Sequence, residues 1–425
     1  MRLNLNQVFS FFSRHFKTNL LELAAKSPYN KLSPGYLTVI EGRHNAPLLA
    51  FVPNPLPPKN WSPSQEVFIG LDRVETALKM LEQKALQSHL LPSMLIAPLI
   101  LEDIKLRNTP DENMGKTIYM GDYIRQLFLA IRDECDLPFS MERFSQWHQG
   151  IFTGPNWQHR GLFRTESLVF TRRENEELSY YFTPPYEPML KCMADLEAFM
   201  NQDQRYPPLI KLALFFYQFL AIHPFGDGNG RMTRFFTTFN LIQTGYLTKP
   251  YFFVGPYLNT HREEYIQSLD QVRYYANWDV WVTYFLSALE NTALALSHRL
   301  DNIESLFQQG VETLLNDNAL HKADIADINT AQKIMQVLFK DPLGEVEYWR
   351  KLAPTLSTDT WQLALKSLQD AQLLTPRMDG DDTEPKVEML DQNLSGDPPH
   401  KYSSLTANWA LTPLIELLNA PLFPI

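Results

Sequence analysis

Twelve residues from His223 to Arg234 combine side chains and glycines that could bind a phosphate group and transfer it. The segment reads His-Pro-Phe-Gly-Asp-Gly-Asn-Gly-Arg-Met-Thr-Arg. Gly228 and Gly230 can adopt backbone angles closed to other residues, so successive N–H groups can point inward around an anion at a helix N-terminus. Arg231 and Arg234 add positive charge to nearly the same side of the first helical turn. The segment therefore predicts a polyphosphate site.

Two side chains of the same segment could supply the reaction chemistry. Asp227 offers the kind of ligand that Mg²⁺ uses, since this ion binds through one or two carboxylates together with phosphate oxygens. His223 is the residue type best matched to accepting a proton near pH 7. Taken singly, each feature is commoner as an ordinary cap, turn or solvated helix face. Together they point to phosphoryl-type chemistry on a nucleotide.

The elements around this segment are predicted to be mainly helical. An apolar helix over 208–222 precedes it and ends at His223, because Pro224 disfavours helical geometry in the residue before it. A new helix over 230–244 follows. The strand-like runs 169–172 and 178–183 predict one small β-hairpin. Apolar periodicity predicts further helices over residues 62–93, 94–105, 117–131, 141–151, 188–200, 262–275 and 280–300.

The last hundred residues are typical of a separate module. Three short helical patterns over 331–339, 346–352 and 358–368 precede strand-like runs at 373–375 and 402–405, an order that resembles a winged helix-turn-helix. Its third helix carries Asp359 and Lys366 but no arginine, and seven acids against one lysine give Asp379–Asp397 a charge of −6. Phosphate contacts need Lys and Arg, so we expect an interaction or dimerisation module and disfavour DNA binding.

Composition limits the class of protein. The 425 residues suffice for several cores, and 44% hydrophobic residues exclude global disorder. Lys and Arg number 38 against 48 Asp and Glu, a net charge of −10 that disfavours a globally basic nucleic-acid binder. Cys135 and Cys192 cannot form a disulfide framework. Without an apolar run of 18 residues or an export signal, we expect a cytoplasmic protein with no membrane partner.

The segment His223–Arg234 resembles the Fic motif, H-P-F-x-[D/E]-G-N-G-R-x-x-R, at every specified position. The resemblance extends to Gly161–Arg164, similar to the family's Gly-x-Phe-Arg element, and to 179–185, similar to the flap hairpin that docks the target. It implies a Fic-fold helical core with that flap and a C-terminal winged helix. The implied domains are an N-terminal extension over 1–55, a helical domain over 56–115, the core over 116–305 and a winged-helix-like domain over 325–425.

The resemblance also implies a reaction, the transfer of AMP from ATP to a Tyr, Thr or Ser hydroxyl of a target protein, with Mg²⁺ as cofactor. His223 would be the catalytic base and Asp227 the metal ligand. Lys replaces Gly230 in the kinase-like Doc branch, so Gly230 favours nucleotidyl transfer. Tyr257 and Asn259 either line the adenine side or are ordinary core and turn residues. The implied phosphate-binding residues are Gly228, Asn229, Gly230, Arg231 and Arg234.

Regulation and partners stay open at this stage. Glu112 lies where many relatives carry an inhibitory glutamate, but Pro110 would interrupt that helix, and the competing interpretation is a capping box with Thr109. The alternative functions are a silent nucleotide-binding regulator, the transfer of another phosphate-linked group, and the removal of AMP. Besides the target protein, the chain itself as a target and a homodimer are the partners to test.

Overall fold

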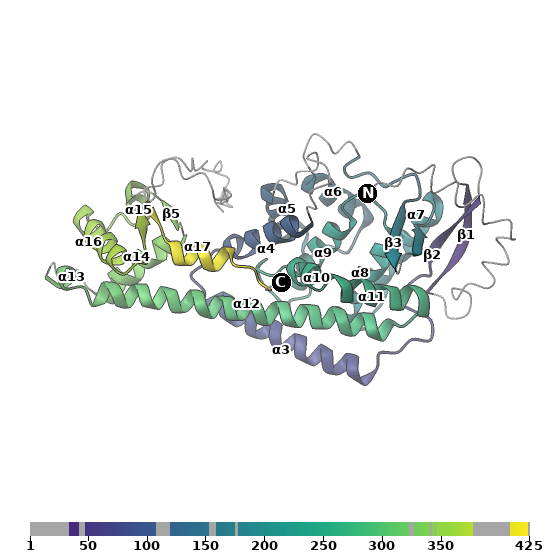
Figure 1. Cartoon of the computed structure of the whole chain (residues 1–425), viewed down its shortest axis with the longest axis horizontal. Helices are drawn as coiled ribbons and strands as arrows, with labels where there is room; N and C mark the ends of the chain where they lie inside the picture. Colours follow the sequence, from purple (N-terminus) through teal and green to yellow (C-terminus); the bar gives the residue numbers. More distant parts are fainter. Residues whose placement is uncertain are drawn as a thin grey trace. The chain divides into compact units, whose positions relative to one another are not determined.

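A computed structural model describes most of the chain as helices joined by short loops, with a few strands (Figure 1). The described residues are 34–41, 47–107, 120–152, 159–174, 177–322, 327–340, 342–344, 346–376 and 409–423. The expectation of a mainly α protein with a small hairpin is confirmed. Within the described residues, no helix is both long and apolar enough to cross a membrane.

The chain divides into two compact units, each assembled from three segments. The first contains Met1–Glu75, Asn113–Thr244 and His261–Leu289, and the second contains Thr76–Glu112, Gly245–Thr260 and Glu290–Ile425. Two helices, α3 (Gln65–Gln87) and α12 (Trp278–Leu315), are divided between the units. The whole Fic-like motif belongs to the first unit.

The first unit is built around α8 (Pro208–Ile222), which is apolar on every side. Twelve of its fifteen residues are buried, as expected for a helix at the centre of a core. The other complete helices of this unit pack with it in the same core, α7 and α9 directly against it. They are α5 (Met120–Glu134), α6 (Met141–Ile151), α7 (Tyr186–Gln202), α9 (Asn229–Gln243) and α11 (Arg262–Tyr275). Phe144, Phe215 and Phe236 pack with ring centroids 4.3 to 5.7 Å apart and join α6, α8 and α9.

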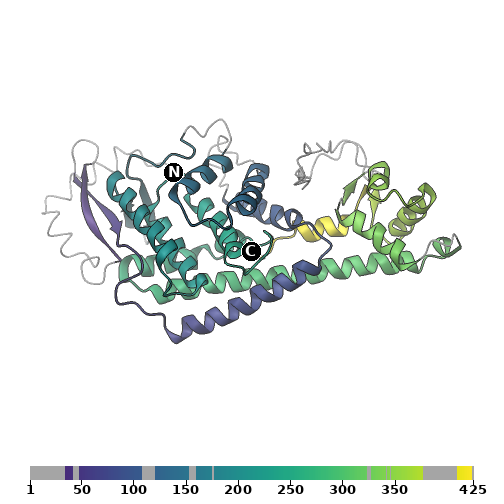
Figure 2. The same cartoon turned by 180° about the vertical axis from the view of Figure 1, so that it is seen from behind.

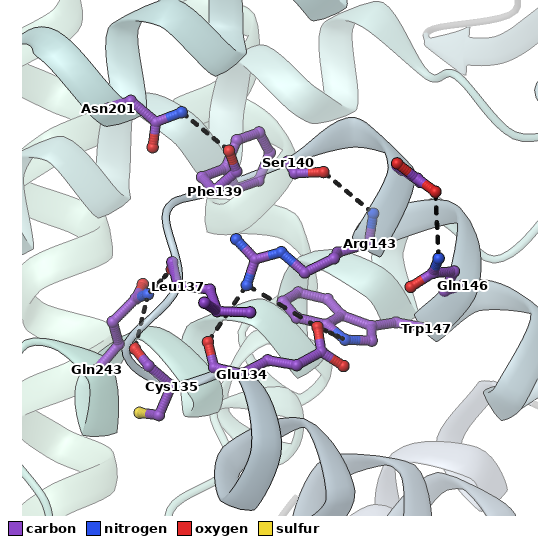
Figure 3. A network of polar contacts seen from close by, with 11 residues as sticks. Glu134, Cys135, Leu137, Phe139, Ser140, Arg143, Gln146, Trp147, Asn201 and Gln243 are labelled. Atoms are coloured by element: carbon purple, nitrogen blue, oxygen red, sulfur yellow. Dashed lines mark hydrogen bonds and ion pairs between the residues drawn. The ribbon is translucent and has the colours of Figure 1, made fainter.

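Polar contacts fix the start of α6, the helix that precedes the Gly-x-Phe-Arg element (Figure 3). Trp147 Nε1 donates to Glu134 at the end of α5 over 3.1 Å, and Gln243 Nε2 donates to the carbonyl groups of Cys135 and Leu137. The side chain of Ser140 caps the helix by accepting from the Arg143 N–H. The connection between α5 and α6 is therefore held by side chains from three helices.

Two antiparallel hairpins complete the first unit. One pairs β3 (Val169–Glu174) with β4 (Glu177–Phe182), as the sequence predicts. The other, which was not predicted from the sequence, pairs β1 (Gly35–Glu41) with β2 (Pro47–Pro53). The ring of Phe51 on β2 lies 5.9 Å from that of Tyr181 on β4, so the two hairpins pack together.

The second unit contains α4 (Pro92–Arg107), which packs against α10 (Gly255–Thr260), and a C-terminal module. Three very short strands of this module pair in the antiparallel order β5-β7-β6. The acidic stretch Asp379–Asp397 lies outside the described residues. Several elements of this module are also visible from behind in Figure 2. In chain order, the elements are α13 (Asn318–Lys322), α14 (Ile328–Lys340), β5 (Leu343–Gly344), α15 (Val346–Leu352), α16 (Thr358–Asp370), β6 (Thr375–Pro376), β7 (Trp409–Ala410) and α17 (Thr412–Asn419).

Candidate functional site

The site begins where α8 ends. His223 is the C-cap of this helix and adopts the left-handed conformation, with φ 53° and ψ 61°. Its N–H still donates to the Phe219 carbonyl over 2.8 Å, and Pro224 then prevents any continuation of the helix. A histidine at positive φ is uncommon, and such strain is concentrated at functional sites. The chain therefore turns sharply at the residue predicted to be the base.

The hydrogen bonding of the His223 imidazole fixes its tautomer. Nδ1 lies 3.1 Å from the carbonyl oxygen of Leu220. Because a carbonyl can only accept, Nδ1 carries the proton and Nε2 keeps an unprotonated lone pair. Burial lowers the pKa of the half-buried His223 to about 4, so the ring is neutral at pH 7. The ring of Phe170 on β3 approaches it edge-on, at a centroid distance of 4.7 Å.

Arg164 holds the end of α8 from a distance of 59 residues in the sequence. Its Nε donates to the carbonyl of His223 over 2.7 Å, and Nη2 donates to the carbonyl of Ile222 over 3.1 Å. Nη2 also donates to Pro184, just after the hairpin, and Nη1 donates to Glu166. Burial lowers the pKa of Arg164 to about 10, which leaves it charged at neutral pH. One guanidinium thus joins the turn at His223 to the base of the flap.

Gly228 occupies a position that only glycine can fill. Its φ is +86°, and a Cβ placed on it would lie 2.5 Å from the Phe152 ring and 3.1 Å from Nε2 of His148. Both the backbone angle and the close packing exclude a side chain. Gly228 is the N-cap of α9, and its carbonyl accepts from the N–H groups of Arg231 and Met232. The amides of this first helical turn are the donors expected for an anion.

The side chain of Asn229 braces the loop rather than facing outward. Its Oδ1 accepts from the N–H of Phe225 over 3.0 Å, and its Nδ2 donates to the carbonyl of the same residue over 2.8 Å. The side chain is buried. Any contact that Asn229 makes with a phosphate would therefore come from its backbone N–H, which belongs to the first turn of α9.

Asp227 and the two arginines differ in exposure. The side chain of Asp227 is 38% exposed, and its Oδ1 accepts from the Gly228 N–H over 2.6 Å and from Nη2 of Arg231 over 3.3 Å. The guanidinium of Arg231 lies 4.4 Å from the centre of the Phe152 ring. Arg234 is almost fully buried in α9, at 1% exposure. The structure thus brings His223, Asp227, Gly228, Asn229, Gly230, Arg231 and Arg234 together at the end of α8 and the start of α9.

His148 on α6, which was not among the predicted site residues, contacts this loop. Its Nε2 lies 3.0 Å from the carbonyl oxygen of Asp227, and its Nδ1 accepts from the Gly161 N–H over 2.9 Å. Burial lowers the pKa of His148 to about 4. One signal could have found it: His148 falls on the buried face that Phe144, Trp147 and Ile151 define, where a polar side chain needs partners.

Three predicted residues belong to the second unit or lie outside the described residues. Tyr257 and Asn259 lie on α10, in the second unit, where the ring of Tyr257 meets that of Phe423 edge-on at 5.1 Å. Their place beside adenine stays a prediction. Glu112, the candidate inhibitory residue, lies outside the described residues.

Comparison with solved structures finds Fic proteins. A Fic family protein from Desulfovibrio desulfuricans is 14% identical with a TM-score of 0.42, and the match covers 77% of this chain and 95% of that one. A Fic domain containing signaling protein from Bacteroides thetaiotaomicron is 16% identical with a TM-score of 0.38, over 56% and 97%. Fic-1 from C. elegans is 18% identical with a TM-score of 0.37, over 56% and 72%. These values are too low to transfer a function.

The comparison with protein families is more direct. The Fic/DOC family matches residues 138–241, a range that begins just before α6 and ends within the last turn of α9. This range includes the glycine-rich loop and the two side chains that bind its backbone or the end of α8, His148 and Arg164. Residues 138–241 of this chain therefore form a Fic/DOC family domain.

Proposed function

We propose that this protein transfers AMP from ATP to a hydroxyl side chain of a target protein and releases pyrophosphate. Domains of the Fic/DOC family are in general transferases of phosphate-linked groups, which sets the class of reaction. The observation that carries the proposal is the tautomer of His223. Its hydrogen bond to Leu220 leaves the Nε2 lone pair as the basic atom, next to a glycine loop that starts a helix.

Each residue then has a defined task. Nε2 of His223 accepts the proton of the target hydroxyl, and that oxygen forms a bond to the α-phosphorus. The bond from the α-phosphorus to its bridging oxygen breaks, and pyrophosphate leaves with the electron pair. The amides of Asn229 and Gly230 and the guanidinium of Arg231 hold the phosphates, Gly228 shapes the turn that presents them, and Arg234 adds positive charge within α9. The phosphates raise the pKa of the nearby imidazole, which strengthens it as a base.

Asp227 fits a magnesium ion carried by the nucleotide. Among the described residues, no group of three or more His, Cys, Asp or Glu gathers as a metal site. Mg²⁺ needs no such group, since one carboxylate together with phosphate oxygens and water suffices. Asp227 is partly exposed at the mouth of the loop, so its carboxylate would hold the ion. When bound, the ion would neutralise charge on the phosphates.

Gly230 supports nucleotidyl transfer over kinase-like chemistry. It lies in the first turn of α9, between Asn229 and Arg231. A lysine here would add a flexible positive side chain to the phosphate site, next to that of Arg231. The alternatives, a silent nucleotide-binding regulator or an enzyme that transfers another phosphate-linked group, share the same loop. They differ in what becomes attached to protein, so one measurement separates them.

We assign the C-terminal module as a winged helix that serves interaction. The support is its element order, α14-β5-α15-α16-β6-β7, and the antiparallel order β5-β7-β6. α16, in the place of a recognition helix, carries Lys366 against Asp359 and Asp370. A helix without net positive charge is poorly suited to DNA phosphates, so a protein partner or a second copy of the chain is favoured.

The test is intact mass analysis after incubation with Mg²⁺ and each of the four nucleoside triphosphates in turn, with and without cell extract. We expect ATP to add the mass of AMP to protein. His223→Ala should slow this transfer by roughly 100- to 10,000-fold, the range for loss of a general base. His298→Ala, which removes an exposed imidazole on α12, is the matched control and should leave the rate unchanged. Equal labelling in His223→Ala, or no mass added by any triphosphate, would contradict the proposal.

A further inference from the structure

The loop before α9 is tied to a neighbouring loop by one buried imidazole. His148 contacts Asp227 through Nε2 and Gly161 through Nδ1, although these residues lie 79 and 13 positions away in the sequence. Gly161 begins the Gly-x-Phe-Arg element that also carries Arg164. His148 therefore connects two segments that also meet at the Phe163–Phe225 bridge, at the bond from the Arg164 N–H to Pro224, and at the bond from Arg164 Nε to the His223 carbonyl.

The two bonds have opposite polarity, and this fixes the state of the ring. The Gly161 N–H can only donate, so Nδ1 of His148 accepts; the Asp227 carbonyl can only accept, so Nε2 donates. The tautomer with its proton on Nε2 is the form that satisfies both. The other tautomer would set Nδ1–H against the Gly161 N–H and leave the Asp227 carbonyl facing the lone pair of Nε2. The imidazole is thus matched to this position as a directed link.

The link is rigid because both the ring and its helix are held. The ring of His148 stacks on Phe225 with centroids 4.0 Å apart and planes 17° from parallel, and Phe152 packs against it at 4.5 Å. The preceding residue, Trp147, is fixed by its bond to Glu134, and Ser140 caps the same helix (Figure 3). A side chain mounted this firmly can hold the atom it binds in one position.

We propose that His148 is a positioning residue, which fixes the backbone of Asp227 and thereby aims its carboxylate at the phosphate site. The inference rests on the proposed function for its consequence, and on the two hydrogen bonds for its geometry. The side-chain contacts of Asp227 described above are local, to Gly228 and Arg231. Asp227, Gly228 and Arg231 belong to the same segment, so they can move together without breaking these contacts. The hydrogen bond to His148 differs because it joins the Asp227 carbonyl to another helix, α6.

Two conservative substitutions separate the two bonds. His148→Gln places an amide N–H near the position of Nε2 and can keep the bond to Asp227. His148→Asn places an amide oxygen near the position of Nδ1 and can keep the bond to Gly161. If His148 acts through Asp227, Gln restores function better than Asn; a merely structural role would make the two equivalent. Trp147→Phe is the matched control, because it also removes one hydrogen bond and some buried volume from α6.

The first measurement is the Mg²⁺ concentration that gives half-maximal ATP binding to the full chain. His148→Asn and His148→Ala should raise it about five- to tenfold, the size expected for one lost hydrogen bond, and His148→Gln should return it to within about twofold of the parent. Trp147→Phe should leave it unchanged even if it lowers the melting temperature. An equal rise in all four variants, or rescue by Asn rather than Gln, would overturn the inference.

The second measurement needs neither turnover nor nucleotide. Hydrogen exchange of the amides from Phe225 to Met232 should be faster in His148→Asn and His148→Ala than in the parent and in His148→Gln. If the parent protein transfers no group from any triphosphate, the proposed function fails, and this exchange pattern still decides the role of His148. Unchanged exchange in His148→Ala would show that the imidazole does not hold the loop.

Discussion

Two connections between consecutive helices, one in each unit, are closed in different ways. The turn from α8 to α9 is held from outside, by Arg164 at Ile222 and His223 and by His148 at Asp227. The turn from α15 to α16 is closed by near neighbours. There, the N–H groups of Ala353 and Leu356 donate to carbonyl groups three or four residues back, and Ser357 caps α16 by accepting from the Thr360 N–H.

This is the difference expected between a loop that binds a ligand, as proposed for the α8–α9 loop, and a loop that only connects two helices. A locally closed turn satisfies its backbone with its own residues and carries little strain. The α8–α9 loop contains a histidine and a glycine at positive φ, so distant side chains are needed to hold it in shape. Preorganisation of this kind is what a phosphate site requires, because donors must already point at the charge that develops.

The largest effect on this contrast should come from Arg164→Met, which removes the outside support at the turn. The variant keeps length and burial but loses four bonds to carbonyl groups, which would leave those carbonyls without their charged donor. We expect a loss of roughly 3 kcal/mol in the free energy of unfolding, measured by urea denaturation, together with loss of transfer activity. Arg164→Lys keeps the charge but loses the planar guanidinium. Its free energy of unfolding should therefore lie between those of the parent protein and Arg164→Met. If Arg164→Met changed the free energy of unfolding by less than about 0.5 kcal/mol, Arg164 would not be one of the side chains that hold this turn.

The second effect is a pH dependence to which two histidines at the α8–α9 loop contribute. Burial lowers the pKa of His223 and of His148 to about 4, while both titrate near 6.5 in the unfolded chain. Between these values the unfolded state binds protons that the folded state refuses, so the free energy of unfolding falls as the pH drops from about 6.5 to 4. Urea denaturation at a series of pH values measures it.

The control for the pH series is His223→Gln, which cannot titrate and should flatten part of the slope. Residues 327–376 of the C-terminal module provide the contrast, because they contain no histidine. A slope in the parent protein that matches the slope in His223→Gln would show that this imidazole is not protected from protons by the fold.

The smallest effect should come from Ser357→Ala in the locally closed turn. The hydroxyl satisfies one amide at the start of α16, and the loss of such a cap costs about 1 kcal/mol. The melting temperature, measured by scanning calorimetry, should fall by a few degrees. Nucleotide binding, measured by titration calorimetry, should not change. A loss of nucleotide binding in this variant would contradict the division between the two loops.

Helix limits were the part of the fold that sequence patterns predicted best. The bounds of α6, α8, α11 and α15 agree with the predicted ranges, because capping residues, proline and apolar periodicity mark their ends locally. By contrast, α12 continues to Leu315, well beyond the predicted end at residue 300, since no local breaker stops it. The β1–β2 hairpin was missed because its stability depends on packing against β4, through Phe51 and Tyr181.

The sequence by itself supplied the candidate chemistry of this protein: one twelve-residue segment contains the histidine, the carboxylate, the glycines and the arginines, and it lies within the residues that match the Fic/DOC family. Only the tertiary structure decided how that segment is held. Its supports are His148 and Arg164, which precede it by dozens of residues and come from another helix and another loop. Hydrogen bonds between such distant residues form only when the whole unit packs. The hydrophobic periodicity of either segment therefore does not predict them.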